Sequence, residues 1–237
     1  MEAKILFNSE AISEKLSIGW GFSCLVNKCV LFDTGEKDEY LFNNIANMEI
    51  DISRIKTVVI SHDHWDHIGG LWKLLEQQKG IKVYSCPNFN SEFKKKVEQS
   101  QGILIESDKF VEIEKNIFVT GEIKGTYKGE YMPEQALVIK TKKGISIITG
   151  CSHPGIIKML KKINNEFPQE LIYSVFGGFH LMDEDNRYIE NIAEQFREMK
   201  IKKAGPTHCS GKEAEGIFKE KYGNNFITLK SGQILDI

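Results

Sequence analysis

The chain has 237 residues, of which 41% are hydrophobic and 27% are charged, and its formal net charge is −2 at pH 7. This is the composition of an ordinary globular protein, and the length predicts one domain spanning residues 1–237. Lys and Arg (31) nearly balance Asp and Glu (33), so there is no basic excess of the kind that nucleic-acid binding requires. We therefore expect a small-molecule substrate and no nucleic-acid partner.

No apolar run approaches the roughly eighteen residues that a membrane-spanning helix needs. The first residues (MEAKILFNSEAISEK) also lack the basic, apolar and cleavage regions of a secretory signal. These features predict a cytoplasmic protein without a membrane partner. The five cysteines form no CxxC pair, so neither a disulfide framework nor a zinc ribbon is expected.

The N-terminal part of the chain alternates short apolar runs with helical patterns. Period-two or continuous apolar runs predict strands, whereas apolar residues three and four apart predict helices. The expected strands are 3–7, 22–26, 29–32, 57–61 and 82–85, and the expected helices are 37–48, 71–75 and 90–101.

The stretch 61–70 (SHDHWDHIGG) follows the β-branched run 57–61 and holds three of the six histidines of the chain. Imidazoles interleaved with carboxylates favour zinc, iron or manganese over calcium or magnesium. A solvated turn is the alternative, but a turn needs neither three imidazoles nor a buried strand to present them. The stretch therefore predicts a catalytic metal site, in which Trp65 is a packing residue or a wall of the substrate cleft. Gly69 and Gly70 allow a tight turn into the following helix.

From Ile103 to Ile148 short apolar runs predict a second sheet, interrupted by a glycine-rich loop, 121–133, that is expected to be mobile. The three remaining histidines follow in the C-terminal half. His153, His180 and His208 each come directly after a predicted strand and before a predicted helix, as do the histidines of 61–70. Open α/β sheets gather their sites at such strand ends, so we expect these three residues near the metal site. The expected helices begin near 156 and span 186–199 and 212–222.

The pattern His-x-His-x-Asp-His, complete at His62, His64, Asp66 and His67, resembles the signature of the metallo-β-lactamase superfamily. Together with GCSHPGI, GGFHL and PTHCSG, it resembles the branch that includes the archaeal dihydropterin aminobenzene phosphate synthase. The resemblance implies an α/β fold, a four-layer αββα sandwich, with two divalent metal ions at one edge. Zinc is the first expectation, and iron or manganese is the alternative.

The resemblance also implies roles for individual residues. His62, His64 and His153 are expected to hold one metal, and Asp66, His67 and His208 the other, with a water activated between the two ions as nucleophile. His180 or Asp63 is then left for proton transfer or for orienting the substrate. Asp33, in Asp33-Thr34-Gly35 after a strand, resembles an aspartate that supports a metal ligand from behind, although a simple turn residue is the alternative.

One departure from the superfamily lies before the strand expected at 136–141. Members usually carry a metal-ligand histidine there, and this chain has Pro133-Glu134-Gln135. Gly150-Cys151 resembles the strand end that normally supplies the ligand shared by both metals. Cys151 is therefore a candidate ligand or a buried thiol, and Glu134 or His153 is a candidate for the missing position.

These patterns predict a metal-dependent hydrolase that acts on a phosphoester or a related small molecule. Two other classes remain open. One is a non-hydrolytic iron or zinc metalloprotein with a redox or ligand-binding role, and the other is a pterin-related synthase. A redox role predicts bound iron with a redox-dependent optical spectrum, whereas hydrolysis predicts activity with zinc or manganese.

Overall fold

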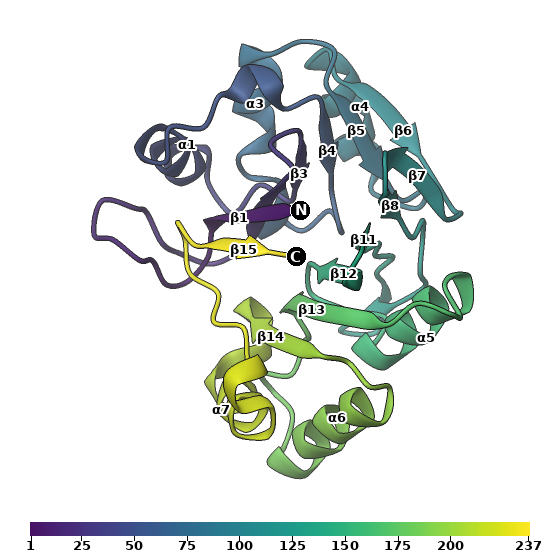
Figure 1. Ribbon diagram of the computed structural model, residues 1–237. Coiled ribbons are helices and arrows are strands. Elements are labelled where there is room, and N and C mark those ends of the chain that lie inside the picture. The colour runs from purple at the N-terminus through teal and green to yellow at the C-terminus, as the bar shows by residue number, and fades with distance from the viewer. The chain divides into compact units, whose positions relative to one another are not determined.

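The computed structural model describes all residues from 1 to 237 (Figure 1). The chain forms two compact units. Unit 1 comprises residues 1–108 and 229–236, and unit 2 comprises residues 109–228 with residue 237. That the whole chain acts as one domain stays a prediction.

Unit 1 is built on a seven-stranded sheet in the order β15-β1-β2-β3-β4-β5-β6. The strands β15, β1, β2 and β3 pair antiparallel, whereas β3, β4, β5 and β6 pair parallel. Figure 1 shows β15, near the C-terminus, beside the first strand of the chain. The strands are β1 (Glu2–Phe7), β2 (Ser23–Val26), β3 (Val30–Phe32), β4 (Thr57–Val59), β5 (Lys82–Ser85), β6 (Ile103–Glu106) and β15 (Ile234–Asp236).

The helices of unit 1 bury one apolar face each. Leu41 and Ile45 of α1, Leu74 of α3 and Phe93 of α4 belong to one buried cluster with strand residues such as Val58. Spacing of three or four residues along each helix places such side chains on one face, which is the pattern seen in the sequence. The helices are α1 (Asp38–Asn47), α2 (Trp65–Ile68), α3 (Leu71–Gln77) and α4 (Ser91–Gln99), with a short 3-10 helix η1 (Ile52–Arg54).

Unit 2 is built on a six-stranded sheet in the order β14-β13-β12-β11-β8-β7. The strands β12, β13 and β14 pair parallel, and the other strands pair antiparallel. A separate hairpin joins β9 to β10. The strands are β7 (Val111–Glu114), β8 (Ile117–Val119), β9 (Thr126–Tyr127), β10 (Glu130–Tyr131), β11 (Leu137–Thr141), β12 (Gly144–Thr149), β13 (Ile172–Gly178) and β14 (Lys203–Thr207).

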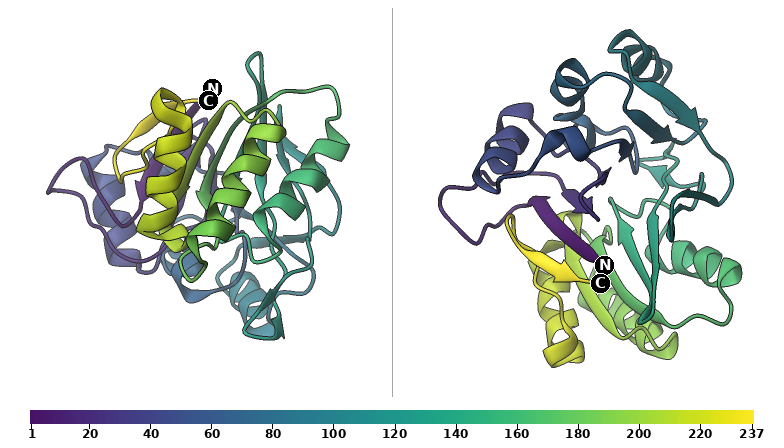
Figure 2. Two further views of the ribbon diagram at one scale, coloured as in Figure 1. Left: turned by 90° about the horizontal axis from the view of Figure 1, so that it is seen from below. Right: turned by 45° about the horizontal axis from the view of Figure 1, so that its top comes forward.

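Three helices lie side by side in unit 2, visible from green to yellow in the left panel of Figure 2. Their apolar faces share one buried cluster with the sheet, which includes Leu160 of α5, Phe196 of α6, Phe218 of α7 and Val175 of β13. The helices are α5 (Ile156–Glu166), α6 (Asn186–Glu198) and α7 (Gly211–Tyr222), with the 3-10 helices η2 (His208–Ser210) and η3 (Gly223–Asn225).

Most predicted elements are confirmed within one or two residues, and three differences concern strands. The second sheet begins at β7, not at residue 103, because β6 pairs parallel with β5 in unit 1. The loop 121–133 contains the hairpin β9–β10. The last strand, β15, returns to unit 1 beside β1. None of the helices combines the length and the apolar character that crossing a bilayer requires.

All six histidines lie where a strand gives way to a helix, as the sequence predicts. His62, His64 and His67 follow β4, His153 follows β12, His180 follows β13, and His208 follows β14. In each unit the strands that carry these residues are parallel, so their carboxyl ends meet at one edge of the sheet.

Candidate metal centre

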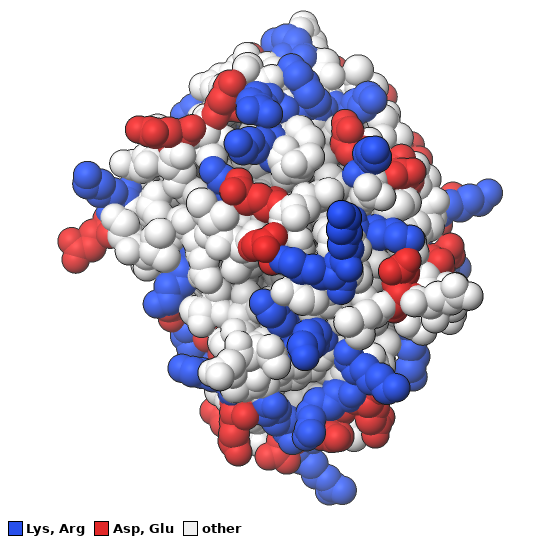
Figure 3. Space-filling view, viewed as in Figure 1, with Lys and Arg blue, Asp and Glu red and all other residues white.

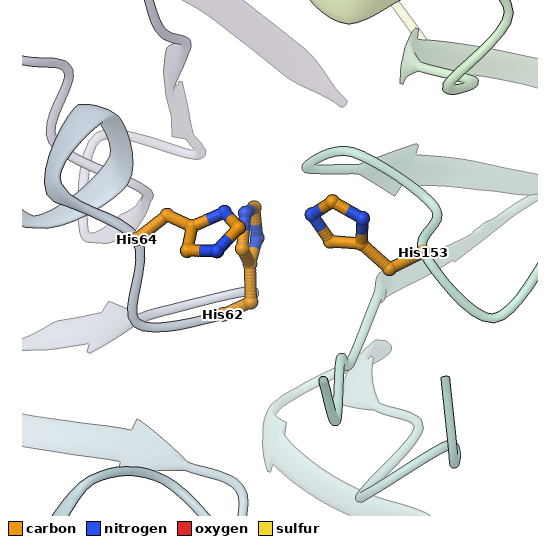
Figure 4. Close-up of side chains that lie close together, drawn as sticks. All are labelled: His62, His64 and His153. Atoms are coloured by element: carbon orange, nitrogen blue, oxygen red, sulfur yellow. The ribbon is translucent and has the colours of Figure 1, made fainter. Parts of the chain in front are cut away.

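The loop after β4 holds three imidazole rings together in unit 1. The ring centroid of His62 lies 4.7 Å from that of His64 and 4.1 Å from that of His67. Figure 4 shows His62 and His64 extending from this loop, and it shows His153 on the loop that follows β12 in unit 2. His62 and His67 are fully buried. Three imidazoles clustered in this way are typical of a metal site rather than of a solvated turn.

Asp33, the residue after β3, fixes the direction of two of these rings. Its carboxylate accepts hydrogen bonds from the backbone N–H and the hydroxyl of Ser61, each at 2.7 Å, and lies 2.7 Å from His67 Nδ1. Because the Ser61 hydroxyl donates to Asp33, its oxygen accepts from His62 Nδ1, 2.9 Å away. A metal would therefore bind both rings through Nε2. Asp33 thus contacts His67 from behind, as its predicted supporting role requires, and that His67 binds a metal stays a prediction. The left-handed backbone of Asp33 (φ 53°) marks a strained position.

Asp66 and His67 offer two ligand atoms at one place. His67 Nε2 lies 3.4 Å from Asp66 Oδ2, and both residues belong to the short helix α2. Burial disfavours a charged imidazole, but the charge and hydrogen bond of Asp33, together with those of Asp66, raise the pKa of His67 well above its ordinary value. Without a metal, Asp33 and Asp66 thus favour the charged form of His67, and a divalent ion would take the place of its Nε2 proton.

The two glycines after the cluster are required by close packing. A Cβ on Gly69 would lie 2.1 Å from the carbonyl oxygen of Glu36, and one on Gly70 would lie 2.7 Å from that of Thr34. No side chain fits at either position. These contacts press the start of α3 against the loop after β3, which is how the loop that carries Asp33 stays under the histidines.

Asp63 and Trp65 occupy different surroundings from the buried ligands. Asp63 Oδ2 accepts a hydrogen bond from the backbone N–H of Asn90, the N-cap residue of α4, at 2.6 Å. Its predicted catalytic role stays a prediction, and this contact shows that it also anchors a helix. The side chain of Trp65 is 59% exposed, so the interpretation of Trp65 as a packing residue is wrong. The other interpretation, in which Trp65 forms a wall of the substrate cleft, stays a prediction.

In unit 2 the loop after β12 is held by Glu134, a fully buried carboxylate. Glu134 Oε1 accepts the backbone N–H groups of Cys151 (2.9 Å) and Ser152 (2.8 Å). Its Oε2 accepts the N–H of His153 at 2.8 Å. Three charge-assisted hydrogen bonds occupy most of what a carboxylate can accept, which argues against Glu134 as a metal ligand. Glu134 instead positions the loop that presents Cys151 and His153.

His153 and His180 lie together in unit 2 under an aromatic residue of the hairpin. Their ring centroids are 4.5 Å apart, and the ring of Tyr127 lies 4.9 Å from His153 and 5.7 Å from His180. The Nδ1 atom of His180 is buried and makes no hydrogen bond. His180 also has a left-handed backbone, with φ 54°. A buried ring nitrogen in a strained residue indicates a functional position.

Cys209, beside His208, was not singled out in the sequence. The ligand atoms of Cys151, His208 and Cys209 lie within 4.8 Å of one another, and so do those of Cys151, His153 and His180. A hydrogen bond with Cys209 raises the pKa of His180, against the opposing effect of burial. Burial raises the pKa of the Cys209 thiol, but a hydrogen bond with Cys151 and the neighbouring His208 and His180 bring it well below its ordinary value.

These donors fit divalent metal ions. Unit 1 supplies imidazole nitrogens whose opposite ring nitrogens are fixed, together with a carboxylate 3.4 Å from one of them. Unit 2 supplies further imidazoles and two thiols. Neutral imidazole, carboxylate and thiolate are the ligands of zinc and of similar transition metals. Histidines whose second ring nitrogen is fixed by a hydrogen bond are characteristic of metal sites in proteins.

The sequence model of the metallo-beta-lactamase superfamily matches residues 23–151, more than half of the chain. The chain belongs to the metallo-beta-lactamase superfamily. It is 30% identical to 7,8-dihydropterin-6-methyl-4-(beta-D-ribofuranosyl)-aminobenzene-5'-phosphate synthase of Methanocaldococcus jannaschii, over 89% of this chain and 85% of that protein. This confirms the branch that the four motifs indicate.

Solved structures agree with this membership. The crystal structure of Tm1679, a metal-dependent hydrolase of the beta-lactamase superfamily, has a TM-score of 0.84 and 30% identity, over 100% of this chain and 99% of that one. The metallo-beta-lactamase fold protein YhfI from Bacillus subtilis has a TM-score of 0.70 at 15% identity, over 99% of both chains, and supports the fold alone. The α/β fold of metallo-β-lactamase type is thus confirmed.

Proposed function

We propose that this protein is a metal-dependent hydrolase of a phosphoester or a related small molecule. The observation that carries the proposal is the relation of Asp33, His67 and Asp66. Asp33 fixes one nitrogen of the His67 ring, and the other nitrogen lies 3.4 Å from Asp66 Oδ2. A buried histidine supported by a carboxylate and facing a second carboxylate has the arrangement of a metal ligand. Membership in a largely hydrolytic superfamily supports the reaction class.

The proposed ligands of one ion are His62, His64 and His153, and those of the other are Asp66, His67 and His208. When bound, two such ions supply Lewis acidity and an activated water. Zinc is the proposed metal, with iron or manganese as alternatives. Three protein ligands for each ion leave a position for water or substrate, as catalytic sites require.

The chain's own residues then orient the substrate and move protons. His180, whose ring nitrogen Nδ1 is buried without a hydrogen bond, is the proposed proton donor to the leaving group. Asp63 is the second candidate for this step, although one of its oxygens holds the start of α4. The exposed Trp65 is proposed as a wall of the substrate cleft.

A small-molecule substrate is proposed rather than a nucleic acid, and a cytoplasmic location is proposed with it. Lys and Arg (31) do not outnumber Asp and Glu (33), and Figure 3 shows side chains of both charges on the face that it draws. Binding to a nucleic-acid backbone would favour a continuous basic surface.

Two other functions remain as alternatives. The 30% identity to the Methanocaldococcus jannaschii synthase favours a pterin-related synthase, which would form a dihydropterin joined to a ribofuranosyl-aminobenzene phosphate. A non-hydrolytic iron or zinc protein is the other. Stoichiometric iron with a redox-dependent optical spectrum would favour the redox role, and turnover of the dihydropterin without hydrolysis would favour the synthase.

The metal proposal is tested by elemental analysis of the purified protein and of a double variant, His62→Ala with Asp66→Ala. We expect about two metal equivalents in the wild type, the number of a two-metal site, and a clear loss in the double variant. Far-ultraviolet circular dichroism should be nearly unchanged, because neither residue belongs to the apolar core clusters and only Asp66 lies in a helix, the four-residue α2. Asp108→Ala, at an exposed position, is the control. Full metal occupancy in a folded double variant would overturn the ligand assignment.

A further inference from the structure

Tyr127, on the β9–β10 hairpin of unit 2, lies against two histidine rings. Its ring centroid is 4.9 Å from that of His153 and 5.7 Å from that of His180, and it meets the His180 ring at 80°. Edge-to-face contact at this distance is a favourable arrangement of aromatic rings. Tyr127 is partly exposed, whereas the Nδ1 atom of His180 is buried. The tyrosine ring therefore contributes to the cover over the His180 ring.

The hairpin that carries Tyr127 is held at its open end. Ile123 and Glu134 exchange two backbone hydrogen bonds, of 2.9 and 3.1 Å. From α5, Lys162 Nζ donates a hydrogen bond of 2.9 Å to the carbonyl oxygen of Glu122. Because the hairpin is held at these two places, Tyr127 has a defined position over the histidines.

Gly125 brings the hairpin onto the backbone of the loop after β12. An added Cβ on Gly125 would lie 2.7 Å from the nitrogen of Pro154 and 2.9 Å from the carbonyl carbon of His153. No side chain fits at these distances, because the atoms that it would meet belong to the backbone. Glycine at this position is thus what lets the hairpin lie close enough for Tyr127 to contact the histidine rings.

Of the two histidines, His180 depends more on Tyr127. The Glu134 carboxylate already fixes the backbone of His153, whose N–H donates a hydrogen bond of 2.8 Å to it. The Nδ1 atom of His180 makes no hydrogen bond, so no polar contact sets the direction of the ring on that side. There the imidazole is held by packing against the rings of Tyr127 and His153.

We propose that Tyr127 is a positioning residue, whose ring covers the His180 imidazole and holds it in the orientation for proton transfer. This inference rests on the proposed function, in which His180 donates a proton to the leaving group. In that step the bond between phosphorus and the leaving oxygen breaks, the oxygen takes a proton from His180, and solvent water returns a proton to the ring. A proton donor held in the reactive geometry speeds this step.

The competing interpretation is that Tyr127 only stabilises the hairpin. Tyr131, on the other strand of the hairpin, is suited as the matched control. It is 46% exposed, and its hydroxyl donates a hydrogen bond of 2.6 Å to Glu122 Oε1. Tyr131→Ala therefore removes a tyrosine from the same hairpin without changing the contact with His180.

Hydrolysis of two phosphomonoesters by the full-length protein tests the positioning role. With phenyl phosphate, we expect Tyr127→Ala to lower kcat about 10- to 100-fold, the effect of a misplaced catalytic group, and to change KM less than about threefold. With p-nitrophenyl phosphate the loss should be much smaller, because p-nitrophenolate leaves without a proton. Tyr127→Phe keeps the ring and should retain most of the turnover. Tyr131→Ala should behave like the wild type with both substrates.

A double-variant cycle shows whether Tyr127 acts through His180. In a His180→Ala background, Tyr127→Ala should change turnover of phenyl phosphate less than about threefold, because the residue that it positions is absent. Gly125→Ala, which displaces the hairpin and leaves Tyr127 in the sequence, should reproduce the loss caused by Tyr127→Ala. Metal content should be the same in these variants and in the wild type.

Chemical modification measures the cover over His180 without any turnover. Diethyl pyrocarbonate modifies accessible imidazole nitrogens, and peptide mapping by mass spectrometry reads each histidine separately. We expect His180 to react at least about fivefold faster in Tyr127→Ala than in the wild type or in Tyr127→Phe, because a covered nitrogen reacts only when its cover opens. His64, in unit 1, should react equally in all three proteins and is the internal reference.

The outcomes separate this inference from the proposed function. Equal reactivity of His180 in Tyr127→Ala and in the wild type would overturn the inference, and so would kcat losses of Tyr127→Ala and His180→Ala that multiply fully in the double variant. Both results would leave the hydrolase proposal intact. Absence of hydrolysis by the wild type would overturn the proposed function and the role in proton transfer, and the reactivity of His180 would then decide whether Tyr127 covers the ring.

Discussion

Asp33 Oδ2 lies 2.7 Å from His67 Nδ1, and both side chains are fully buried. The same carboxylate accepts hydrogen bonds from the backbone N–H and the hydroxyl of Ser61. Through these contacts a residue at the end of β3 sets the direction of rings on the loop after β4. A position that was only a candidate in the sequence is therefore the support of the candidate metal centre.

Replacing Asp33 should weaken metal binding without removing a ligand. We expect Asp33→Asn to lower metal affinity about 10- to 100-fold, the usual effect of losing a carboxylate behind a histidine ligand. Competition with a chromophoric chelator measures this affinity. Asp108→Asn, at an exposed position, is the control and should bind like the wild type. Equal affinity of Asp33→Asn and wild type would mean that Asp33 does not support a ligand.

The His67–Asp33 pair also predicts a pH dependence of the metal-free protein. Burial opposes the imidazolium, but Asp33 and Asp66 raise the folded-state pKa of His67 well above the ordinary 6.5. The stability from the pair is therefore complete below about pH 6.5 and is lost as the pH rises through the folded-state pKa. In excess chelator, the gap in unfolding free energy between wild type and His67→Gln should narrow as the pH is raised. Urea unfolding at several pH values measures it.

An Asp33→Asn background is the control for that experiment. In the Asp33→Asn background, the change in unfolding free energy caused by His67→Gln should depend much less on pH, because the main cause of the raised pKa of His67 is absent. A gap that widens with rising pH in the wild-type background would contradict the assignment of a charged His67 in the metal-free protein.

Removing Glu134 should destabilise unit 2. Glu134→Ala would leave three buried backbone N–H groups without their acceptor, and at ~1–3 kcal/mol for each group we expect a loss of at least ~3 kcal/mol in unfolding free energy. Glu134→Gln keeps one carbonyl oxygen as acceptor and should lose less. Glu114→Gln, at an exposed position of β7, is the matched control and should change little. Equal stability of Glu134→Ala and wild type in urea would contradict the positioning role.

Structural features that form between neighbouring residues of the chain can be predicted from the sequence, whereas features that join distant residues cannot. The His-x-His-x-Asp-His pattern after a β-branched run contains its own strand, loop and helix, so the site loop was predictable. The partner of β6 was not, because strand pairing joins residues far apart in the chain and neighbouring apolar runs look alike. The role of Glu134 depends on backbone groups 17 to 19 residues away, and no local pattern marks it.

His180 is predicted to serve chemistry rather than metal binding. His180→Ala should keep both metal equivalents and lose about 10²-fold or more in turnover, the scale of a general acid or base. His180→Gln, which retains a polar side chain of similar length, should lose activity to a similar extent because it does not transfer protons at neutral pH. Metal analysis and kinetics on one preparation decide the role. Loss of one metal equivalent would make His180 a ligand.

Metal-dependent hydrolysis is tested most directly by measuring turnover of a panel of phosphomonoesters, phosphodiesters, thioesters and lactones by protein of known metal content. We expect hydrolysis of at least one phosphoester, loss of this activity after chelation, and its recovery when Zn²⁺ is restored. Absence of hydrolysis across the panel by protein that carries two metal equivalents would contradict it.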